Sequence, residues 1–271
     1  MRFTKMQGLG NDYVYLDCTK EMPQDLPALA VKVADRHFGI GSDGLICICP
    51  SQTGDFRMQM FNADGSEGEM CGNGIRCVGK FVYDKGLTSK TDLTIETRAG
   101  LKKLKLQVED GKVFQVTVDM GVPVPGETVT IQVDGDDYEL QKVSMGNPHA
   151  VTFMKEIEGL DLQRKGPVFE YHPAFPERVN TEFVQVVDAT HLKMRVWERG
   201  SGETLACGTG SCATLVAAVL AGKAERKATI HLLGGDLQVY WDETDGHIYM
   251  TGPAVTVFEG EWPGDHKKSK S

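Results

Sequence analysis

Cys71-Gly72-Asn73-Gly74 is repeated as Cys207-Gly208-Thr209-Gly210, 136 residues further along a chain of 271. The same offset relates Gly10-Asn11 to Gly146-Asn147. Similarity at a fixed offset is the sequence signature of a duplicated structural unit. We therefore expect two pseudo-symmetric halves, each with a cysteine before a glycine-rich turn, and a cleft with one thiol on either wall.

The composition is that of an ordinary globular protein, with 41% hydrophobic and 25% charged residues. The net charge of −9 and the pI near 5.3 argue against a nucleic-acid partner, because binding to a phosphate backbone needs a basic face. The longest apolar stretch, 213–221, is far too short to cross a bilayer, and the N-terminus lacks a signal-peptide pattern. We expect a cytoplasmic protein with no membrane partner.

Strand and helix patterns alternate through both halves and predict an α/β (α+β) fold. Helical periodicity covers residues 26–38, 74–84 and 208–221. The proline-containing stretch 120–126 is the expected linker. We expect an N-terminal lobe over 1–119 that carries Cys71, a C-terminal lobe over 120–252 that carries Cys207, a final strand near 253–262 that returns to the first lobe, and a disordered tail over 263–271.

Both repeated cysteines stand at the N-terminal end of a predicted helix, where unpaired amides and the helix dipole favour a thiolate. The glycines that follow let backbone N–H groups approach a carboxylate closely. Removing the α-proton of an amino acid needs a base on one face, an acid on the other, and stabilisation of the charge that flows into the carboxylate. The repeated element meets all three needs.

Further strings along the chain carry a resemblance to a known family. They are Gly10-Asn11-Asp12, Phe61-Asn62-Ala63-Asp64-Gly65-Ser66, Cys71-Gly72-Asn73-Gly74, Gly146-Asn147-Pro148-His149, Val179-Asn180-Thr181-Glu182-Phe183, and Trp197-Glu198-Arg199-Gly200 followed by Cys207-Gly208-Thr209-Gly210. Together they resemble the diaminopimelate epimerase family. The resemblance implies a cofactor-independent isomerase with two lobes, each a mixed or antiparallel sheet wrapped around a central helix. It also implies a homodimer that converts LL-2,6-diaminopimelate to the meso form in lysine and peptidoglycan precursor biosynthesis.

Matched position by position, the resemblance makes Cys71 and Cys207 the acid–base pair, with roles that exchange according to the direction of reaction. His149 and Glu198 would tune the cysteines or orient the substrate's amine. The substrate's polar groups would be bound by Asn11, Asn62, Gly72, Asn73, Asn147, Asn180, Glu198, Arg199, Gly208 and Thr209. One position departs from the pattern, because Gly44 stands where some members carry a glutamine. A contact there must come from the backbone or from a neighbour.

Alternatives to this function remain open. Residues 208–213 fit the dinucleotide pattern G-x-G-x-x-A, which predicts a nicotinamide-dependent oxidoreductase, but the repeat copy at 72–77 breaks the pattern at its third small residue. Proline or hydroxyproline racemases and PhzF-like isomerases share the expected fold. A ring substrate with one carboxylate, however, would not need Arg199 together with Asn62 and Asn180. A non-catalytic binding module would be unaffected by replacement of either repeated cysteine.

Several residues also have purely structural interpretations. Gly10-Asn11 and His149 are also typical of turns, and Glu198-Arg199 of a solvated strand end. Seven cysteines without a secretory signal indicate reduced thiols, and their spacings fit a zinc site poorly, so no metal is expected. The five cysteines outside the repeat are expected in the core, namely Cys18, Cys47, Cys49, Cys77 and Cys212.

Overall fold

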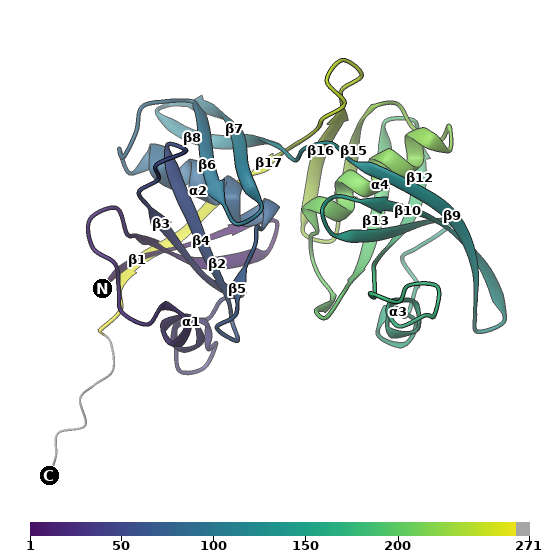
Figure 1. Cartoon of the computed structure of the whole chain (residues 1–271), viewed down its shortest axis with the longest axis horizontal. Coiled ribbons are helices and arrows are strands. Elements are labelled where there is room, and N and C mark those ends of the chain that lie inside the picture. Colours follow the sequence, from purple (N-terminus) through teal and green to yellow (C-terminus); the bar gives the residue numbers. More distant parts are fainter. Residues whose placement is uncertain (264–271) are drawn as a thin grey trace, which may run out of the picture. The chain divides into compact units, whose positions relative to one another are not determined.

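The computed structural model describes residues 1–263, which form two compact units (Figure 1). Unit 1 comprises Met1–Val116 and the C-terminal segment that starts at Pro253, and unit 2 comprises Thr117–Gly252. Both units combine helices with parallel and antiparallel strands, which confirms the α/β fold class. Apart from Pro263, the tail expected over 263–271 lies outside the described residues.

In unit 1 the strands pair in the order β18–β1–β2–β3–β4–β6–β7, and only β2–β3 and β4–β6 are parallel. The short β5 pairs with β4. The elements are β1 (Arg2–Gly8), β2 (Asn11–Asp17), α1 (Leu26–Ala34), β3 (Gly44–Cys49), β4 (Phe56–Asn62), β5 (Glu67–Gly68), α2 (Gly72–Asp84), β6 (Asp92–Thr97), β7 (Gly100–Glu109), β8 (Lys112–Asp119), whose last residues belong to unit 2, and β18 (Val255–Glu261).

In unit 2 the strands pair in the order β9–β10–β11–β12–β13–β15–β16–β17, and only β11–β12 and β13–β15 are parallel. The short β14 pairs with β13. The elements are β9 (Val124–Val133), β10 (Asp136–Ser144), β11 (Pro148–Met154), α3 (Leu162–Glu170), β12 (Asn180–Asp188), β13 (His191–Glu198), β14 (Gly202–Glu203), α4 (Gly208–Leu220), β15 (Lys227–Leu232), β16 (Gly235–Trp241) and β17 (Ile248–Pro253).

The two units are copies of one arrangement, as the repeat in the sequence predicts. Both ends of α2 and α4 are separated by the repeat offset, and the same is true of α1 and α3. The parallel pairs β2–β3 and β11–β12 keep the same register, with Val14 opposite Leu45 and Ala150 opposite Thr181. In unit 1, β18 pairs with β1 in the place that β9 takes beside β10 in unit 2. The end of the chain therefore completes the unit that its beginning started.

The central helix of each unit is buried, and its sequence reflects the strands around it. Helix α4 packs against β10, β11, β12, β13, β15 and β16, which explains why Ala, Val and Leu occupy all its sides. Helix α2 packs against β1, β2 and β7 and contains Arg76, whose side chain is fully buried. Arg76 donates from Nε to the Pro253 carbonyl at 3.0 Å and from Nη1 to the Gly72 carbonyl at 3.3 Å. It thereby ties the returning C-terminal segment to α2.

Two helices differ from the prediction. The helix expected over 26–38 ends at Ala34, because the Asp35 carboxylate accepts hydrogen bonds from the amides of His37 and Phe38 and turns the chain there. Helix α3 was not expected at all, since Pro167 lies inside it and its sequence is polar. The expected linker over 120–126 also runs into β9, which begins at Val124.

Candidate functional site

Each repeated cysteine is the N-cap of its central helix. Cys71 has φ −128° and ψ 118°, and its sulfur accepts a hydrogen bond from the Gly74 amide at 3.3 Å. Cys207 has φ −126° and ψ 112°, and its sulfur accepts from the Gly210 amide at 3.4 Å. A sulfur in this position faces the positive end of the helix dipole, so both caps favour a thiolate.

In unit 1 the Cys71 thiol donates to Oδ1 of Asn11 at 3.0 Å. The Asn11 amide nitrogen donates to Oδ2 of Asp43 at 2.9 Å, and Asp43 is paired through Oδ1 with Arg36 at 2.9 Å. Asp43 therefore orients the Asn11 amide with its oxygen toward the sulfur. A carbonyl oxygen can only accept, so this contact favours the protonated form of Cys71.

In unit 2, Cys207 lies among titratable groups. Burial raises the pKa of the Cys207 thiol well above its usual value, and the carboxyl groups of Glu198 and Glu182 add to the rise. The Thr209 hydroxyl, 3.6 Å from the sulfur, and the Gly210 amide act in the opposite direction. The two cysteines thus share a helix position but have different neighbours.

His149 and Glu182 form a fully buried pair beside Cys207. Nδ1 of His149 lies 2.6 Å from Oε1 of Glu182, and neither side chain is exposed to solvent. Nε2 of His149 lies 3.1 Å from Oδ1 of Asn147, whose amide nitrogen donates to the Thr209 hydroxyl at 3.4 Å. Burial raises the pKa of Glu182, although the His149 ring works against that rise. The pair is therefore joined to Cys207 through Asn147 and Thr209.

Asn180 connects the ends of three segments of unit 2. Its amide nitrogen donates to the Pro148 carbonyl at 2.8 Å, and its oxygen accepts from the Arg199 amide at 2.9 Å. The Arg199 side chain is exposed and donates to the Glu177 carbonyl at 3.1 Å. Asn180 therefore fixes the backbone that presents Arg199.

The remaining candidates lie at the ends of strands and at the starts of the two central helices. Asn62 ends β4 and donates to the Ser66 hydroxyl at 3.0 Å. Glu198 ends β13 and accepts from the Thr204 hydroxyl. Gly72 and Asn73 begin α2, and Gly208 and Thr209 begin α4. Unit 1 thus brings Asn11 and Cys71 together, and unit 2 brings Asn147, His149, Thr209 and Cys207 together.

Helix α3 supports the loop that carries Glu198 and Arg199. Its buried Glu170 accepts from the Trp197 indole at 2.8 Å and from the Gly200 amide at 2.9 Å. Sequence reasoning missed this helix, although the repeat offset maps the nine residues of α1 onto it. It also missed Glu182 and Asp43 as partners of the site, and the signal for Glu182 is a carboxylate inside an otherwise apolar strand.

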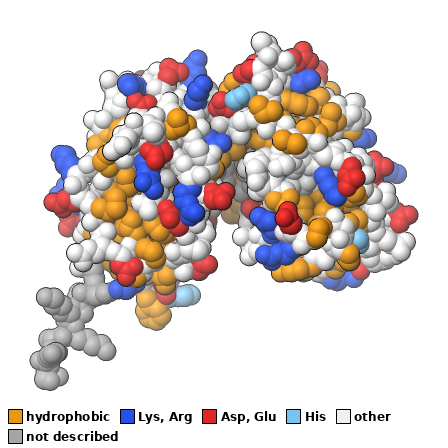
Figure 2. Space-filling model, in the orientation of Figure 1, with side chains coloured by type: hydrophobic (Ala, Val, Ile, Leu, Met, Phe, Trp, Pro, Cys, Tyr) orange, Lys and Arg blue, Asp and Glu red, His pale blue; other side chains and the backbone are white. Residues whose placement is uncertain are grey.

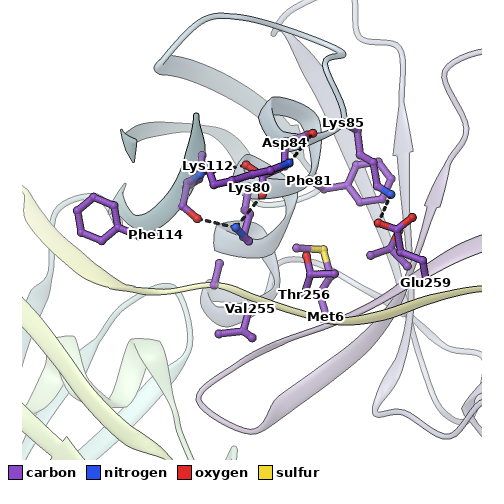
Figure 3. A pocket seen from close by; sticks show the side chains of 13 residues that line it. Met6, Lys80, Phe81, Asp84, Lys85, Lys112, Phe114, Val255, Thr256 and Glu259 are labelled. Atoms are coloured by element: carbon purple, nitrogen blue, oxygen red, sulfur yellow. Dashed lines mark hydrogen bonds and ion pairs between the residues drawn. The ribbon is translucent and has the colours of Figure 1, made fainter. Parts of the chain in front are cut away.

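The other cysteines and the hollows of the surface give no second site. The five cysteines outside the repeat are all buried. A hollow of ≈ 510 Å³ in unit 1 contains none of the candidate residues (Figure 3). Its walls carry the ion pairs Lys80–Asp84 and Lys85–Glu259, and the Lys112 ammonium donates to the Asp84 carbonyl. Within residues 1–263, no group of His, Cys, Asp and Glu side chains is arranged to hold a metal ion.

The surface and the helices agree with the charge pattern of the sequence. On the face drawn in Figure 2, acidic and basic side chains are interspersed over both units. None of the helices in the described part of the chain combines the length and apolar character needed to cross a membrane.

The fold is shared with solved structures of several isomerase-like proteins. One is a PhzF-family phenazine biosynthesis protein from Bacillus anthracis, with a TM-score of 0.75 and 18% identity, covering 96% of this chain and 98% of the other. Another is a hydroxyproline epimerase from Agrobacterium vitis, with a TM-score of 0.72 and 17% identity, covering 96% of this chain and 90% of the other. At such identities the likeness defines the class of fold alone.

Sequence comparison narrows this class to one family. The profile of diaminopimelate epimerase matches residues 3–125 and 142–257. The diaminopimelate epimerase of Acetivibrio thermocellus is 57% identical over 274 residues, covering 96% of this chain and 98% of its own. That of Desulfovibrio desulfuricans is 57% identical over 281 residues, covering 97% and 98%. The chain belongs to the diaminopimelate epimerase family, and it is an isomerase.

Proposed function

We propose that the chain epimerises LL-2,6-diaminopimelate to meso-2,6-diaminopimelate, the activity for which its relatives are named. The observation that carries the proposal is the pair of cysteine N-caps with matching backbone geometry, one in each copy of the repeat. An amino-acid α-carbon has two faces, and inversion requires a proton to leave from one face and arrive on the other. A duplicated thiol supplies one acid–base group for each face.

In the proposed reaction, one cysteine acts as thiolate and removes the α-proton while the other, as thiol, delivers a proton to the opposite face. Cys71 and Cys207 exchange these roles in the reverse direction. The Asn11 contact favours the thiol form of Cys71, and the helix N-termini favour the thiolate of either residue. His149 and Glu198 adjust the proton affinity of the cysteines, and Glu198 also accepts from the substrate's ammonium group.

The carboxylate of the reacting centre would be bound by backbone amides at the starts of α2 and α4. Helix N-termini bind anions through unpaired N–H groups, and the proton abstraction makes this carboxylate more negative. The residues assigned to this position are Gly72, Asn73, Gly208 and Thr209. Arg199 would hold the distal carboxylate, since its guanidinium is exposed and has donors to spare. Asn11, Asn62, Asn147 and Asn180 complete the set of amides for the polar groups of the substrate.

Three further features belong to the same proposal. The reaction uses no organic cofactor, because the two thiols and the helix amides supply every group that the proton transfer needs. The chain works as a homodimer, and it works in the cytoplasm, where its seven thiols stay reduced. The organisation into an N-terminal lobe with Cys71 and a C-terminal lobe with Cys207 suits closure over the substrate, which would exclude water from the carbanion.

The direct test is conversion of LL-diaminopimelate by the purified, reduced chain without pyridoxal phosphate, nucleotide or metal, followed by chiral chromatography. We expect the meso isomer to form, and proline and hydroxyproline to remain unchanged. Cys207→Ala should abolish conversion, whereas Cys212→Ala, a matched change on the same helix, should retain it. Activity on proline alone, or full activity of Cys207→Ala, would overturn the proposal.

A further inference from the structure

The repeat provides an internal comparison for the buried His149–Glu182 pair. At the repeat offset, Tyr13 stands in unit 1 where unit 2 has His149, and Ile46 stands where unit 2 has Glu182. The pair is therefore not required to build the fold, because the first copy builds the same strands without it. Its burial beside Cys207 points to a role in the chemistry of that thiol.

The hydrogen bonds around His149 fix where its hydrogens lie. Nε2 faces the oxygen of the Asn147 amide, which can only accept, so Nε2 carries a hydrogen. A second hydrogen lies between Nδ1 and Oε1 of Glu182, which are 2.6 Å apart. The pair thus holds two hydrogens and is neutral as a whole. Oε2 of Glu182 has no hydrogen-bond partner among the described residues, which disfavours a full negative charge there.

The hydrogen-bond directions continue from His149 to the sulfur. Because the Asn147 oxygen accepts from Nε2, its amide nitrogen donates to the Thr209 hydroxyl. The Thr209 oxygen is then an acceptor, and its own hydrogen is available to Cys207, 3.6 Å away. A hydroxyl that donates to sulfur stabilises a thiolate.

We propose that Glu182 is a positioning residue: by holding Nδ1 of His149 it keeps a hydrogen on Nε2, so that the chain His149–Asn147–Thr209 donates toward Cys207. The carboxyl group also lies against the start of α4, since a Cβ added at Gly210 would be 2.7 Å from Oε1 of Glu182 and 3.2 Å from the Cys207 sulfur. The inference rests on the proposed function only in treating Cys207 as an acid–base group.

The sign of one measurement separates this role from a simple charge effect. In Glu182→Gln the site stays neutral, but the amide can offer Nδ1 either an oxygen or an N–H group, so His149 is no longer held in one form. The Thr209 hydroxyl then donates to the sulfur for only part of the time, and the apparent pKa of Cys207 rises. If Glu182 were instead a bare carboxylate, its removal would lower that pKa.

The test is the rate of alkylation of Cys207 by iodoacetamide from pH 7 to pH 10.5, resolved by mass spectrometry of the Cys207 peptide. We expect alkylation of Glu182→Gln to be about threefold to tenfold slower below the pKa of the thiol, the effect of one net hydrogen bond. The matched control is Glu203→Gln, since Glu203 pairs with Arg195 at 2.8 Å outside the chain to Cys207. Glu198 also faces the sulfur and is left unchanged in every variant. Equal or faster alkylation of Glu182→Gln overturns the proposal.

A double-mutant cycle tests whether Glu182 acts through the chain. Thr209→Val removes the last hydroxyl, so Glu182→Gln should add no further slowing in that background. Independent slowing by the two changes contradicts the proposed connection.

Nitrogen-15 NMR of the histidine rings in the unmutated protein gives a measurement that does not depend on the folding of any variant. We expect Nε2 of His149 to carry a hydrogen at pH 7, and a bare Nε2 overturns the proposal. Neither readout uses a substrate, so failure of this inference is distinguishable from failure of the proposed epimerase activity.

Discussion

Replacing Gly166 with alanine should loosen the loop that presents Glu198 and Arg199, although neither residue is touched. Gly166 lies on α3, and an added Cβ would come within 2.1 Å of Cδ2, 2.3 Å of Cε3 and 2.5 Å of Cγ of the Trp197 indole. The indole cannot turn away freely, because it is 8% exposed and its Nε1 is bonded to Glu170.

The expected loss of stability follows from three contributions. Overpacking a rigid buried ring costs about 1–3 kcal/mol. Weakening the hydrogen bond from Trp197 to Glu170 costs about 1–3 kcal/mol more. Alanine is better than glycine inside a helix by about 1 kcal/mol, which offsets part of this cost. We expect Gly166→Ala to lower the free energy of unfolding by roughly 3 kcal/mol.

The assay is urea unfolding followed by far-UV circular dichroism, with the activity measured separately on the folded variant. Gly159→Ala is the matched control, because a Cβ there meets nothing within 4 Å. It should leave the stability within about 0.5 kcal/mol of the unmutated chain. We also expect Gly166→Ala to raise KM, because Glu170 holds the Gly200 amide next to Arg199. A change in stability below about 0.5 kcal/mol for Gly166→Ala would refute the packing argument.

Two other changes give distinct outcomes. Gly210→Ala should lower kcat by at least about tenfold, because its Cβ meets the carboxyl group of the buried pair at 2.7 Å, whereas the equivalent Gly74→Ala meets only the terminal methyl of a core isoleucine at 2.8 Å and should cost less activity; equal losses would contradict the asymmetry. Burial works to raise the pKa of Asp12, but hydrogen bonds from Arg36 and Lys5 outweigh it and lower that pKa below 3.8. The stability from this carboxylate is therefore present above about pH 4 and lost as the pH falls through the lowered value, so Asp12→Asn should flatten the acid limb of a stability-against-pH curve measured by urea unfolding; an unchanged acid limb would count against it.

Much of the fold could be predicted because the chain states it twice. The repeated cysteine strings located both central helices, since a glycine-rich turn followed by apolar residues is typical of a helix start. The helix over 162–170 escaped periodicity analysis because Pro167 and its polar neighbours hide it. The offset would have revealed it from the more regular α1.

The candidate residues were easier to predict than their connections. Motif strings identify Asn147 and His149 as neighbours in sequence, but the partner of His149 lies on the adjacent strand β12, and only the parallel pairing of β11 with β12 brings Glu182 to it. Likewise, Asp43 reaches Asn11 through the pairing of β2 with β3. These contacts depend on strand register, which local sequence patterns do not contain.

The central claim is that two separate thiols act on the two faces of one carbon, and the fate of the α-proton tests it most directly. The measurement is proton NMR and mass spectrometry of LL-diaminopimelate incubated with the reduced chain in D₂O, at low conversion. Two bases require the meso product to carry one deuterium at the inverted centre while unreacted LL substrate keeps its protium. Product that retains the original protium, or deuterium that enters substrate and product alike from the start, would contradict the account.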